Sequence, residues 1–374
     1  MAGLYIHIPF CKKACIYCDF HFSTSLKYKQ EMVDAICKEL KMRKEFLNNK
    51  PLKSIYFGGG TPSLMEKNDL DQIFDAIHHN FSVDTEAEIT LEANPDDLTT
   101  DKLKSLSASL INRLSIGVQS FRDEDLILMN RSHNSQQAEK CISQAQDLGL
   151  ENISIDLIYA QPNMSNRVWK EQLQKAISLN VNHISSYALT VEPKTVLAYK
   201  IKTGEIKELN DETAFDQFSI LVDELSQAGY DHYEVSNFSK NGRRAVHNSS
   251  YWKGDPYLGV GPSAHSFCPG LRSWNISNNA LYLKGIESGE MAMESENLSL
   301  QDQFNEWLMI SLRTMEGLDR NVLELQFQDF KNHFQTELIP LLSLGKLEEN
   351  GDRIFIPRAW RFHSDGIASS LFYI

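Results

Sequence analysis

Apolar and polar positions in the first half of the chain follow two alternating patterns. Short, nearly continuous apolar runs, typical of buried strands, are separated by longer stretches whose apolar residues recur every three or four positions, typical of amphipathic helices. The expected strands are 4–9, 53–58, 87–93, 113–119, 153–160 and 183–191. The expected helices are 27–47, 66–80, 100–109, 135–148 and 165–179. This alternation predicts a parallel sheet with right-handed crossovers.

The number of strands limits how such a sheet can close. Six βα units are too few for an eight-stranded barrel, so the expected fold class is α/β, with a partial, TIM-like (β/α)6 barrel over residues 1–230. In barrels of this kind the reactive groups gather at the C-terminal ends of the strands. Candidate functional residues are therefore expected just beyond each strand.

The pattern changes beyond residue 230. Residues 231–295 are rich in aromatic, Gly and His residues and are expected to form a loop-rich segment packed on the barrel. Residues 296–374 contain helical periodicity at 303–315, 321–327 and 333–347, then a turn at 349–357 and a final helix. Helices followed by a hairpin predict a smaller, α-rich, winged-helix-like C-terminal domain.

Charge and targeting signals narrow the choice of partners. The 374 residues include 50 acidic and 37 basic ones, a net charge of -13, which argues against nucleic acid as a partner. No apolar run approaches the ~18 residues that span a bilayer, so no transmembrane segment is expected, although peripheral membrane association stays open. The N-terminus lacks the features of a signal peptide. A cytoplasmic protein is expected.

Three of the six cysteines fall close together, as Cys11-x-x-x-Cys15-x-x-Cys18. In a reducing compartment such a cluster indicates metal or redox chemistry rather than disulfides. An iron–sulfur cluster held by three thiolates leaves one iron open to a small molecule. Zinc is the alternative, with His7 and His21 flanking the cysteines as further ligands.

This cysteine spacing, after the strand-like YIHIPF and with Tyr17 before the third cysteine, resembles the signature of the radical S-adenosylmethionine (SAM) family. The resemblance implies that 1–230 is a radical SAM core and that it holds one [4Fe–4S] cluster through Cys11, Cys15 and Cys18, with SAM on the open iron. The segment GGGTP is similar to the family's glycine motif, and glycines let backbone approach a ligand closely.

Further polar residues lie at matching positions beyond the later strands. Singly each has an ordinary alternative, such as an ion pair of Glu92 with Arg113 or a surface position for Arg131. Asp156, in the apolar run ISIDLIYA, is a stronger indication, because acidic residues buried in strands are often functional. Together with the resemblance, these positions imply a SAM site formed by Tyr5, Tyr17, Gly59, Gly60, Thr61, Glu92, Gln119, Arg131 and Asp156.

Longer motifs resemble one branch of the family, the coproporphyrinogen dehydrogenase-like proteins. They are YIHIPFCKKACIYCDF, FGGGTPS, EANPD, RLSIGVQSF and SIDLIYAQP. The branch includes the oxygen-independent coproporphyrinogen III dehydrogenase and a heme chaperone. Phe20 stands where the dehydrogenase has a further cysteine. That enzyme also carries an extension ahead of its first strand, and because the first strand here begins at residue 4, no such extension is expected.

The segment HNSSYW is similar to the H-N-x-x-Y-W motif of the heme chaperones. An imidazole is a good axial ligand for heme iron, and aromatic rings pack on porphyrins, although a single His in a loop is more often simply hydrogen-bonded. The resemblance implies heme contacts by His247, Asn248, Tyr251 and Trp252. His265 is a second candidate ligand.

The function expected from these motifs is that of a heme chaperone, which binds the cluster, SAM and heme and delivers heme to an acceptor protein. The expected partners are heme, a heme-accepting protein and an electron donor. The alternative is an oxygen-independent coproporphyrinogen III dehydrogenase that cleaves SAM and decarboxylates propionate side chains. A heme-modifying radical SAM methyltransferase is a third hypothesis, and the purpose of SAM is left open.

Overall fold

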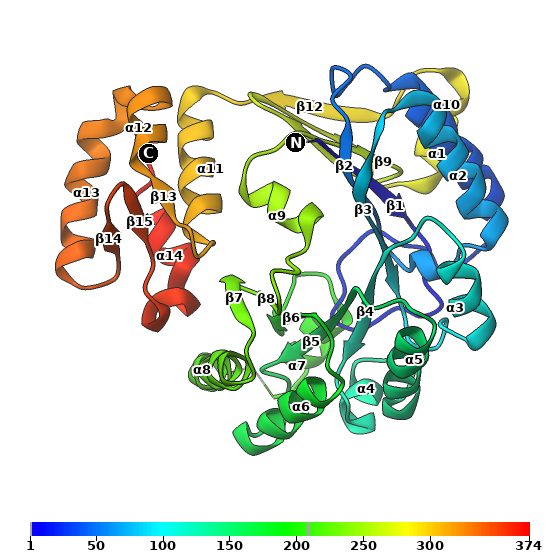
Figure 1. Cartoon of the computed structure of the whole chain (residues 1–374), viewed down its shortest axis with the longest axis horizontal. Coiled ribbons are helices and arrows are strands. Elements are labelled where there is room, and N and C mark those ends of the chain that lie inside the picture. Colours follow the sequence, from blue (N-terminus) through cyan, green and yellow to red (C-terminus); the bar gives the residue numbers. More distant parts are fainter. Residues whose placement is uncertain (1, 208–209) are drawn as a thin grey trace.

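The computed structural model describes residues 2–207 and 210–374, and its main feature is one curved sheet with helices on its outer face (Figure 1). Six parallel strands follow one another in order around the curve, and two sets of further strands extend the sheet at its ends. The six consecutive strands of the barrel are β1 (Ala2–Ile8), β2 (Leu52–Gly59), β3 (Val83–Ala93), β4 (Arg113–Gln119), β5 (Ile153–Tyr159) and β6 (His183–Ala188). The full order is β12-β11-β10-β9-β1-β2-β3-β4-β5-β6-β8-β7. The predicted open (β/α)6 barrel is thus confirmed.

Helices connect these strands and cover the outside of the barrel (Figure 1). Helices α1, α2, α3, α5 and α6 lie where the apolar periodicity predicts them, and the two short helices α4 and α7 were not expected. The helices of this half are α1 (Lys29–Met42), α2 (Lys67–Asn80), α3 (Thr100–Ser107), α4 (Asp123–Leu128), α5 (Ser135–Asp147), α6 (Asn166–Ser178), α7 (Val196–Lys202) and α8 (Asp211–Gln227), with a 3-10 turn η1 (Pro62–Leu64).

Alternation along each strand separates the core from the barrel interior. In β1, Leu4, Ile6 and Ile8 are at most 1% exposed and belong to the main hydrophobic core. Tyr5 and His7 point to the other face, where Tyr5 stacks on Tyr56 of β2 with ring centroids 6.2 Å apart. Because side chains alternate along a strand, the same sequence both builds the core and lines the site.

The expectation of a loop-rich segment at 231–295 was wrong. This stretch carries β7 (Asp231–Glu234), β8 (Asn237–Ser239), α9 (Val246–Trp252), β9 (Tyr257–Val260), β10 (His265–Cys268), β11 (Leu271–Asn275), α10 (Asn279–Ser288) and β12 (Met293–Asn297). Strand β9 is parallel to β1, and β10–β12 continue the sheet with antiparallel pairing. Most strands of this segment are too short to show an apolar pattern. Strand β12 lacks one because it is the exposed edge of the sheet and its residues are polar.

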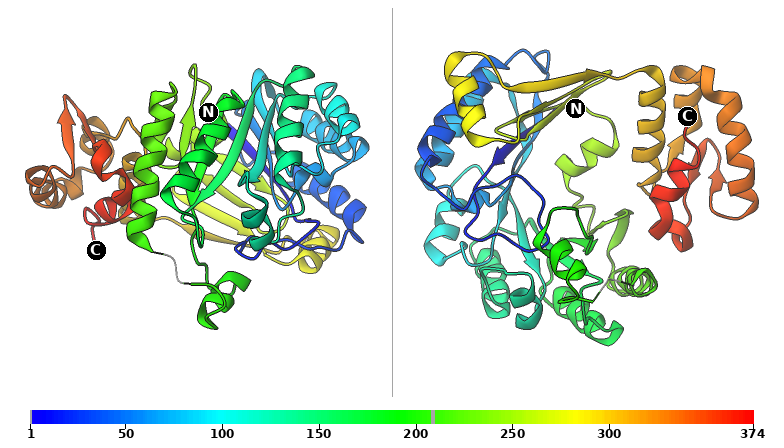
Figure 2. Two further views of the ribbon diagram at one scale, coloured as in Figure 1. Left: turned by 90° about the horizontal axis from the view of Figure 1, so that it is seen from below. Right: turned by 180° about the vertical axis from the view of Figure 1, so that it is seen from behind.

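The C-terminal part has its own hydrophobic core and packs beside the open side of the barrel (Figure 2). It consists of α11 (Leu300–Leu312), β13 (Leu318–Asp319), α12 (Arg320–Gln326), η2 (Gln328–Phe330), α13 (Lys331–Ser343), β14 (Glu348–Asn350), β15 (Arg353–Phe355), η3 (Arg358–His363) and α14 (Ser364–Ser369). Its three strands pair in the order β13-β15-β14. The predicted helical C-terminal region is present, and within the described residues no helix has the length and apolar character needed to span a bilayer.

Candidate functional site

The three clustered cysteines lie in the loop that follows β1, at the C-terminal end of the parallel strands. The loop is tied down at its base, where Cys11 N–H donates to the Ser23 carbonyl at 3.0 Å. In its middle, Ile16 is buried in a small apolar cluster under the loop. Its backbone bridges two distant segments, donating to the Met129 carbonyl at 3.2 Å and accepting from Leu197 N–H at 2.8 Å. The loop is therefore positioned by packing as well as by its ends.

The thiols of this loop have the donors that a sulfur-ligated cluster needs around it. All three are free and half-buried. The Thr61 hydroxyl donates to Cys11 Sγ and Arg131 donates to Cys15 Sγ, each at 3.4 Å. Burial raises the pKa of Cys18 to about 11, so an iron bound there would be what favours the thiolate. Hydrogen bonds to sulfur tune iron–sulfur clusters, so this donor set fits a [4Fe–4S] cluster.

The zinc alternative finds less support. His7 uses both ring nitrogens, since Nδ1 pairs with the Tyr5 hydroxyl at 3.2 Å and Nε2 with the His21 carbonyl at 2.9 Å. In residues 2–207 and 210–374, no group of three His, Cys, Asp or Glu side chains is placed to hold a metal ion. A zinc site that used His7 would have to displace one of the two hydrogen bonds of its ring.

The glycines of GGGTP hold the cysteine loop against β2. Gly60 N–H donates to the Ile8 carbonyl at 2.9 Å and Thr61 N–H to the Phe10 carbonyl at 2.6 Å. A Cβ on Gly60 would lie 2.6 Å from Phe10 O, and one on Gly59, whose φ is +104°, would lie 2.5 Å from His7 Nδ1. Each of these two positions therefore requires glycine, and the close approach places the cysteines beside Thr61.

Two predicted carboxylates, Glu92 on β3 and Asp156 on β5, face the interior from strands that are separated by β4. Tyr56 donates to Glu92 Oε1 at 2.7 Å. Desolvation raises the pKa of Glu92 to about 7, the Tyr56 hydrogen bond opposes this rise, and the charge of Asp156 adds to it. Desolvation likewise raises the pKa of Asp156 to about 6, against a hydrogen bond from Ser185. Such shifts are common where a site awaits a cationic or hydrogen-bonding ligand.

Arg131 joins the cysteine loop to the strand ends. It donates to Asn94 Oδ1 at 2.6 Å and to the Gly117 carbonyl at 2.7 Å, besides Cys15, while its buried Nε has no partner among the described residues. Gln119 lies beside it, at the end of β4 with a φ of +67°. Sequence reasoning missed Asn94, although it stands two positions after Glu92 in the same motif.

The raised pKa of Glu92 predicts a pH dependence of stability. Between its unfolded value of 4.5 and about 7 the folded protein binds the extra proton, so the free energy of unfolding falls as pH rises through this window. We expect Glu92→Gln to reduce that slope, by at most ~1.4 kcal/mol per pH unit. Thermal unfolding at several pH values between 4.5 and 7 measures the slope. Glu86→Gln, an exposed carboxylate of the same strand, is the control, and an unchanged slope in Glu92→Gln would contradict the assignment.

The predicted heme motif forms helix α9, not a loop, and its histidine is buried against the strand beginnings. His247 is 1% exposed. Its Nδ1 pairs with the Ser54 hydroxyl and its Nε2 with the Tyr251 hydroxyl, each at 2.8 Å. Burial lowers the pKa of His247 to about 3, so the ring is neutral. In this arrangement neither ring nitrogen is free to bind iron.

The other residues of the motif point in different directions. Tyr251 lies in the wall of a cavity, in edge-to-face contact with Tyr257 at 4.6 Å between centroids. Trp252 instead faces the C-terminal end of helix α11, where the guanidinium of Arg313, the residue after the helix, lies 5.2 Å from its ring centroid. Asn248 is half-buried and does not line the cavity. The motif thus contributes one side chain, Tyr251, directly to the cavity.

This cavity, of about 600 Å³, connects the predicted SAM residues with the predicted heme motif. Its size is in the range of small-molecule and cofactor sites. Aromatic and histidine side chains dominate its walls. It is lined by Tyr5, His7, Asp19, Phe20, His21, Phe22, Gly59, Glu92, Tyr251, Tyr257, Ser263, His265 and Ser277. We call it the mouth cavity.

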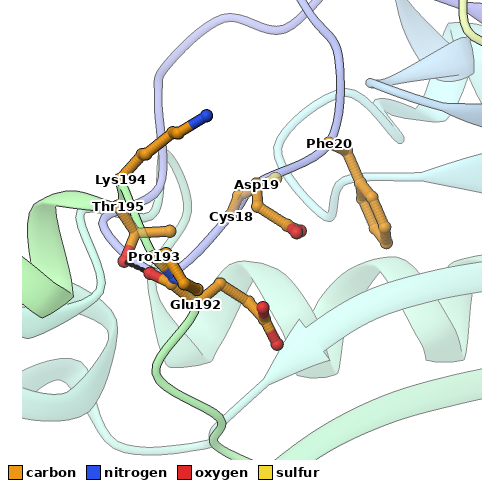
Figure 3. A pocket seen from close by; sticks show the side chains of 7 residues that line it. All are labelled: Cys18, Asp19, Phe20, Glu192, Pro193, Lys194 and Thr195. Atoms are coloured by element: carbon orange, nitrogen blue, oxygen red, sulfur yellow. Dashed lines mark hydrogen bonds between the residues drawn. The ribbon is translucent and has the colours of Figure 1, made fainter.

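A second cavity, of about 450 Å³, opens at the outer side of the cysteine loop (Figure 3). Cys18, Asp19 and Phe20 form one wall and the segment 192–195, beyond β6, forms the other. The Thr195 hydroxyl donates to the Glu192 carbonyl at 2.7 Å, and Thr195 is the N-cap residue of α7. Asp19 and Phe20 line both this cavity and the mouth cavity, and Phe20 is 68% exposed.

An open six-stranded barrel with this cysteine loop and glycine segment defines a radical SAM protein. The Radical SAM superfamily profile matches residues 5–179. The fold is similar to that of the coproporphyrinogen III oxidase HemN from Escherichia coli, a radical SAM enzyme, with a TM-score of 0.86 and 23% sequence identity over 99% of this chain and 90% of that one. The superfamily implies a [4Fe–4S] cluster and SAM as cofactors.

More specific similarities identify the family. The chain is 32% identical to the heme chaperone HemW of Lactococcus lactis over 94% of this chain and 92% of that protein. It is 33% identical to HemW of Bacillus subtilis over 86% and 85%. The mitochondrial radical S-adenosyl methionine domain-containing protein 1 of Danio rerio is 31% identical over 87% and 75%. The chain belongs to the HemW family, as its motifs predicted.

Proposed function

We propose that this protein is a heme chaperone, which binds heme in the mouth cavity and passes it to an acceptor protein. The carrying observation is that Tyr251, from the motif with which the sequence matches heme chaperones, lines the same cavity as the predicted SAM residues Gly59 and Glu92. Aromatic walls suit a porphyrin, because its flat apolar face packs on them. Membership of the HemW family supports the same function.

The cofactor assignments are part of the proposal. Cys11, Cys15 and Cys18 would hold one [4Fe–4S] cluster, which supplies one-electron reduction when bound. Arg131 and Thr61 orient the cysteine sulfurs by hydrogen bonds. Near them, a SAM site would include Tyr5, Tyr17, Gly59, Gly60, Thr61, Glu92, Gln119, Arg131 and Asp156.

The two cavities suggest how the partners approach. An electron donor would dock over the second cavity, which Cys18 lines (Figure 3). Heme would reach the mouth cavity from the other side of Phe20. Electron delivery and heme exchange would then use separate openings.

The first test is heme retention by the full chain after anaerobic cluster reconstitution, measured as heme absorbance that co-elutes with the protein in gel filtration. We expect wild type to retain heme. We expect His247→Ala to bind it about 10- to 100-fold more weakly, because Tyr251 loses the partner that orients it.

The chain offers a matched control for this variant. His183 is also fully buried and is likewise held between a serine and a tyrosine, Ser154 and Tyr233, each at 2.7 Å. Tyr251, the partner of His247, lines the mouth cavity, whereas Tyr233 and His183 do not. His183→Ala should therefore keep heme retention. Failure of wild type to retain heme, together with turnover of coproporphyrinogen III, would overturn the chaperone proposal in favour of a dehydrogenase.

A further inference from the structure

The histidines around the mouth cavity differ in how free their ring nitrogens are. His7 uses both nitrogens, and His21 uses Nε2 with Asn279 Oδ1 at 2.7 Å. His247 lies behind Tyr251 with both nitrogens engaged. His265 lines the cavity, is exposed, and makes no ring hydrogen bond within residues 2–207 and 210–374. A metal ligand needs a free lone pair. Among the described residues His265 is exposed and has both ring nitrogens unpaired, whereas His21 is half-buried and keeps only Nδ1 unpaired, and His7 and His247 keep neither.

We propose that His265 is the axial ligand of heme iron in the mouth cavity, and that His247 acts behind the wall by holding Tyr251. This inference rests on the proposed heme binding and specifies the ligand within it. The Fe–N bond forms from the lone pair of a neutral imidazole, so no proton leaves and no redox change is required. Ligation at His247 would instead require the ring to give up a hydrogen bond to Tyr251 or Ser54.

The strands around His265 hold it in a defined position, as a ligand requires. Its backbone begins β10 and pairs with Trp274 of β11. The two rings stack, with centroids 5.8 Å apart and planes 23° apart, which sets the direction of the imidazole. On the other side its carbonyl approaches Gly259 so closely that a Cβ there would lie 2.0 Å away.

A buried network fixes the turn that leads to His265. Glu39 of α1 accepts Gly261 N–H at 2.8 Å and the Tyr282 hydroxyl at 2.7 Å through Oε2. Its Oε1 accepts from Asn275, at 2.8 Å, and from Arg43. The turn from Gly261 to Ala264 therefore rests on a carboxylate that is 0% exposed. Such an inner layer of contacts limits the movement of the residue in front of it.

The test is the spectrum of ferric heme bound to the full chain. We expect His265→Ala to lose the nitrogen-ligated absorbance and EPR signature and to bind heme at least about tenfold more weakly, which corresponds to ~1.4 kcal/mol. His265→Gln keeps the size and polarity of the side chain and should lose the signature as well. In His265→Gly, added imidazole should restore it.

A matched control is available in His363, which is also exposed and stacks on Phe215 at 5.8 Å and 18° outside the cavity. His363→Ala should leave the heme spectrum unchanged. Wild-type ligation in His265→Ala would overturn the ligand assignment, and a change confined to His247→Ala or Tyr251→Phe would place the ligand in the motif. Both results leave heme binding intact, whereas absence of heme from wild type would instead refute the proposed function.

Discussion

Replacing Cys18 by Ala is expected to leave the reconstituted protein without its iron–sulfur absorbance and with a large loss of bound iron. The thiol stands in the loop after β1, at the strand ends where Thr61 and Arg131 donate hydrogen bonds to the neighbouring sulfurs. A cluster with one ligand removed has no further cysteine in the loop to replace it. Iron and sulfide analysis with absorbance after anaerobic reconstitution measures the effect.

Cys37 is the matched control for this prediction. It is also a half-buried free thiol, and burial raises its pKa to about 11, as it does for Cys18. It lies in α1 and donates to the Gln72 carbonyl at 3.6 Å, away from the cysteine loop. Cys37→Ala should therefore retain the full cluster. Equal iron content in the Cys18 and Cys37 variants would contradict the assignment of the ligands.

The barrel was predictable because its signals are local and repeated. In β1, three buried aliphatic residues alternate with Tyr5 and His7, and similar patterns recur in the other parallel strands. Each helix between them covers the outer face and therefore shows an apolar stripe. Because parallel strands all end at one edge, residues just beyond each strand could be grouped into one site from the sequence alone.

The segment 231–295 was not predictable in this way. Strand β9 consists of four residues, YLGV, and its place beside β1 depends on pairing with a segment more than 200 residues earlier. The helical position of His247 was also missed, since HNSSYW has no amphipathic pattern long enough to indicate a helix. Such features are set by tertiary contacts, which a short window of sequence does not contain.

In the site, too, the sequence identified the motif residues but not the residues that support them. Glu92 and Arg131 were identified from position and resemblance. Tyr56, which donates to Glu92, and Asn94, which accepts from Arg131, were not identified. An ordinary strand tyrosine and a loop asparagine carry no distinctive signal, and only the geometry shows what they orient. Whether the implied residues bind SAM and heme stays a prediction.

Replacing Glu39 by Leu is expected to destabilise the barrel more than any surface change, by about 3–5 kcal/mol in the free energy of unfolding. The carboxylate is fully buried and accepts from Arg43, Asn275, Tyr282 and the backbone of Gly261. Leucine leaves the buried guanidinium without its counter-charge and the other donors without an acceptor. Burying a charge or a donor without its partner destabilises the folded state by far more than the intact ion pair stabilises it.

A second variant, Glu39→Gln, tests whether this network also positions the mouth cavity. Glu39→Gln keeps a hydrogen-bond acceptor and the size of the side chain but loses its charge. Its unfolding temperature in calorimetry should therefore lie between those of wild type and Glu39→Leu. Glu171→Leu, which breaks the exposed pair of Arg167 and Glu171 on α6, is the control and should stay within about 1 kcal/mol of wild type. Because Gly261 leads directly to His265, Glu39→Gln should weaken heme ligation even where the protein remains folded. A folded Glu39→Gln variant with a wild-type heme spectrum would show that the network supports stability alone.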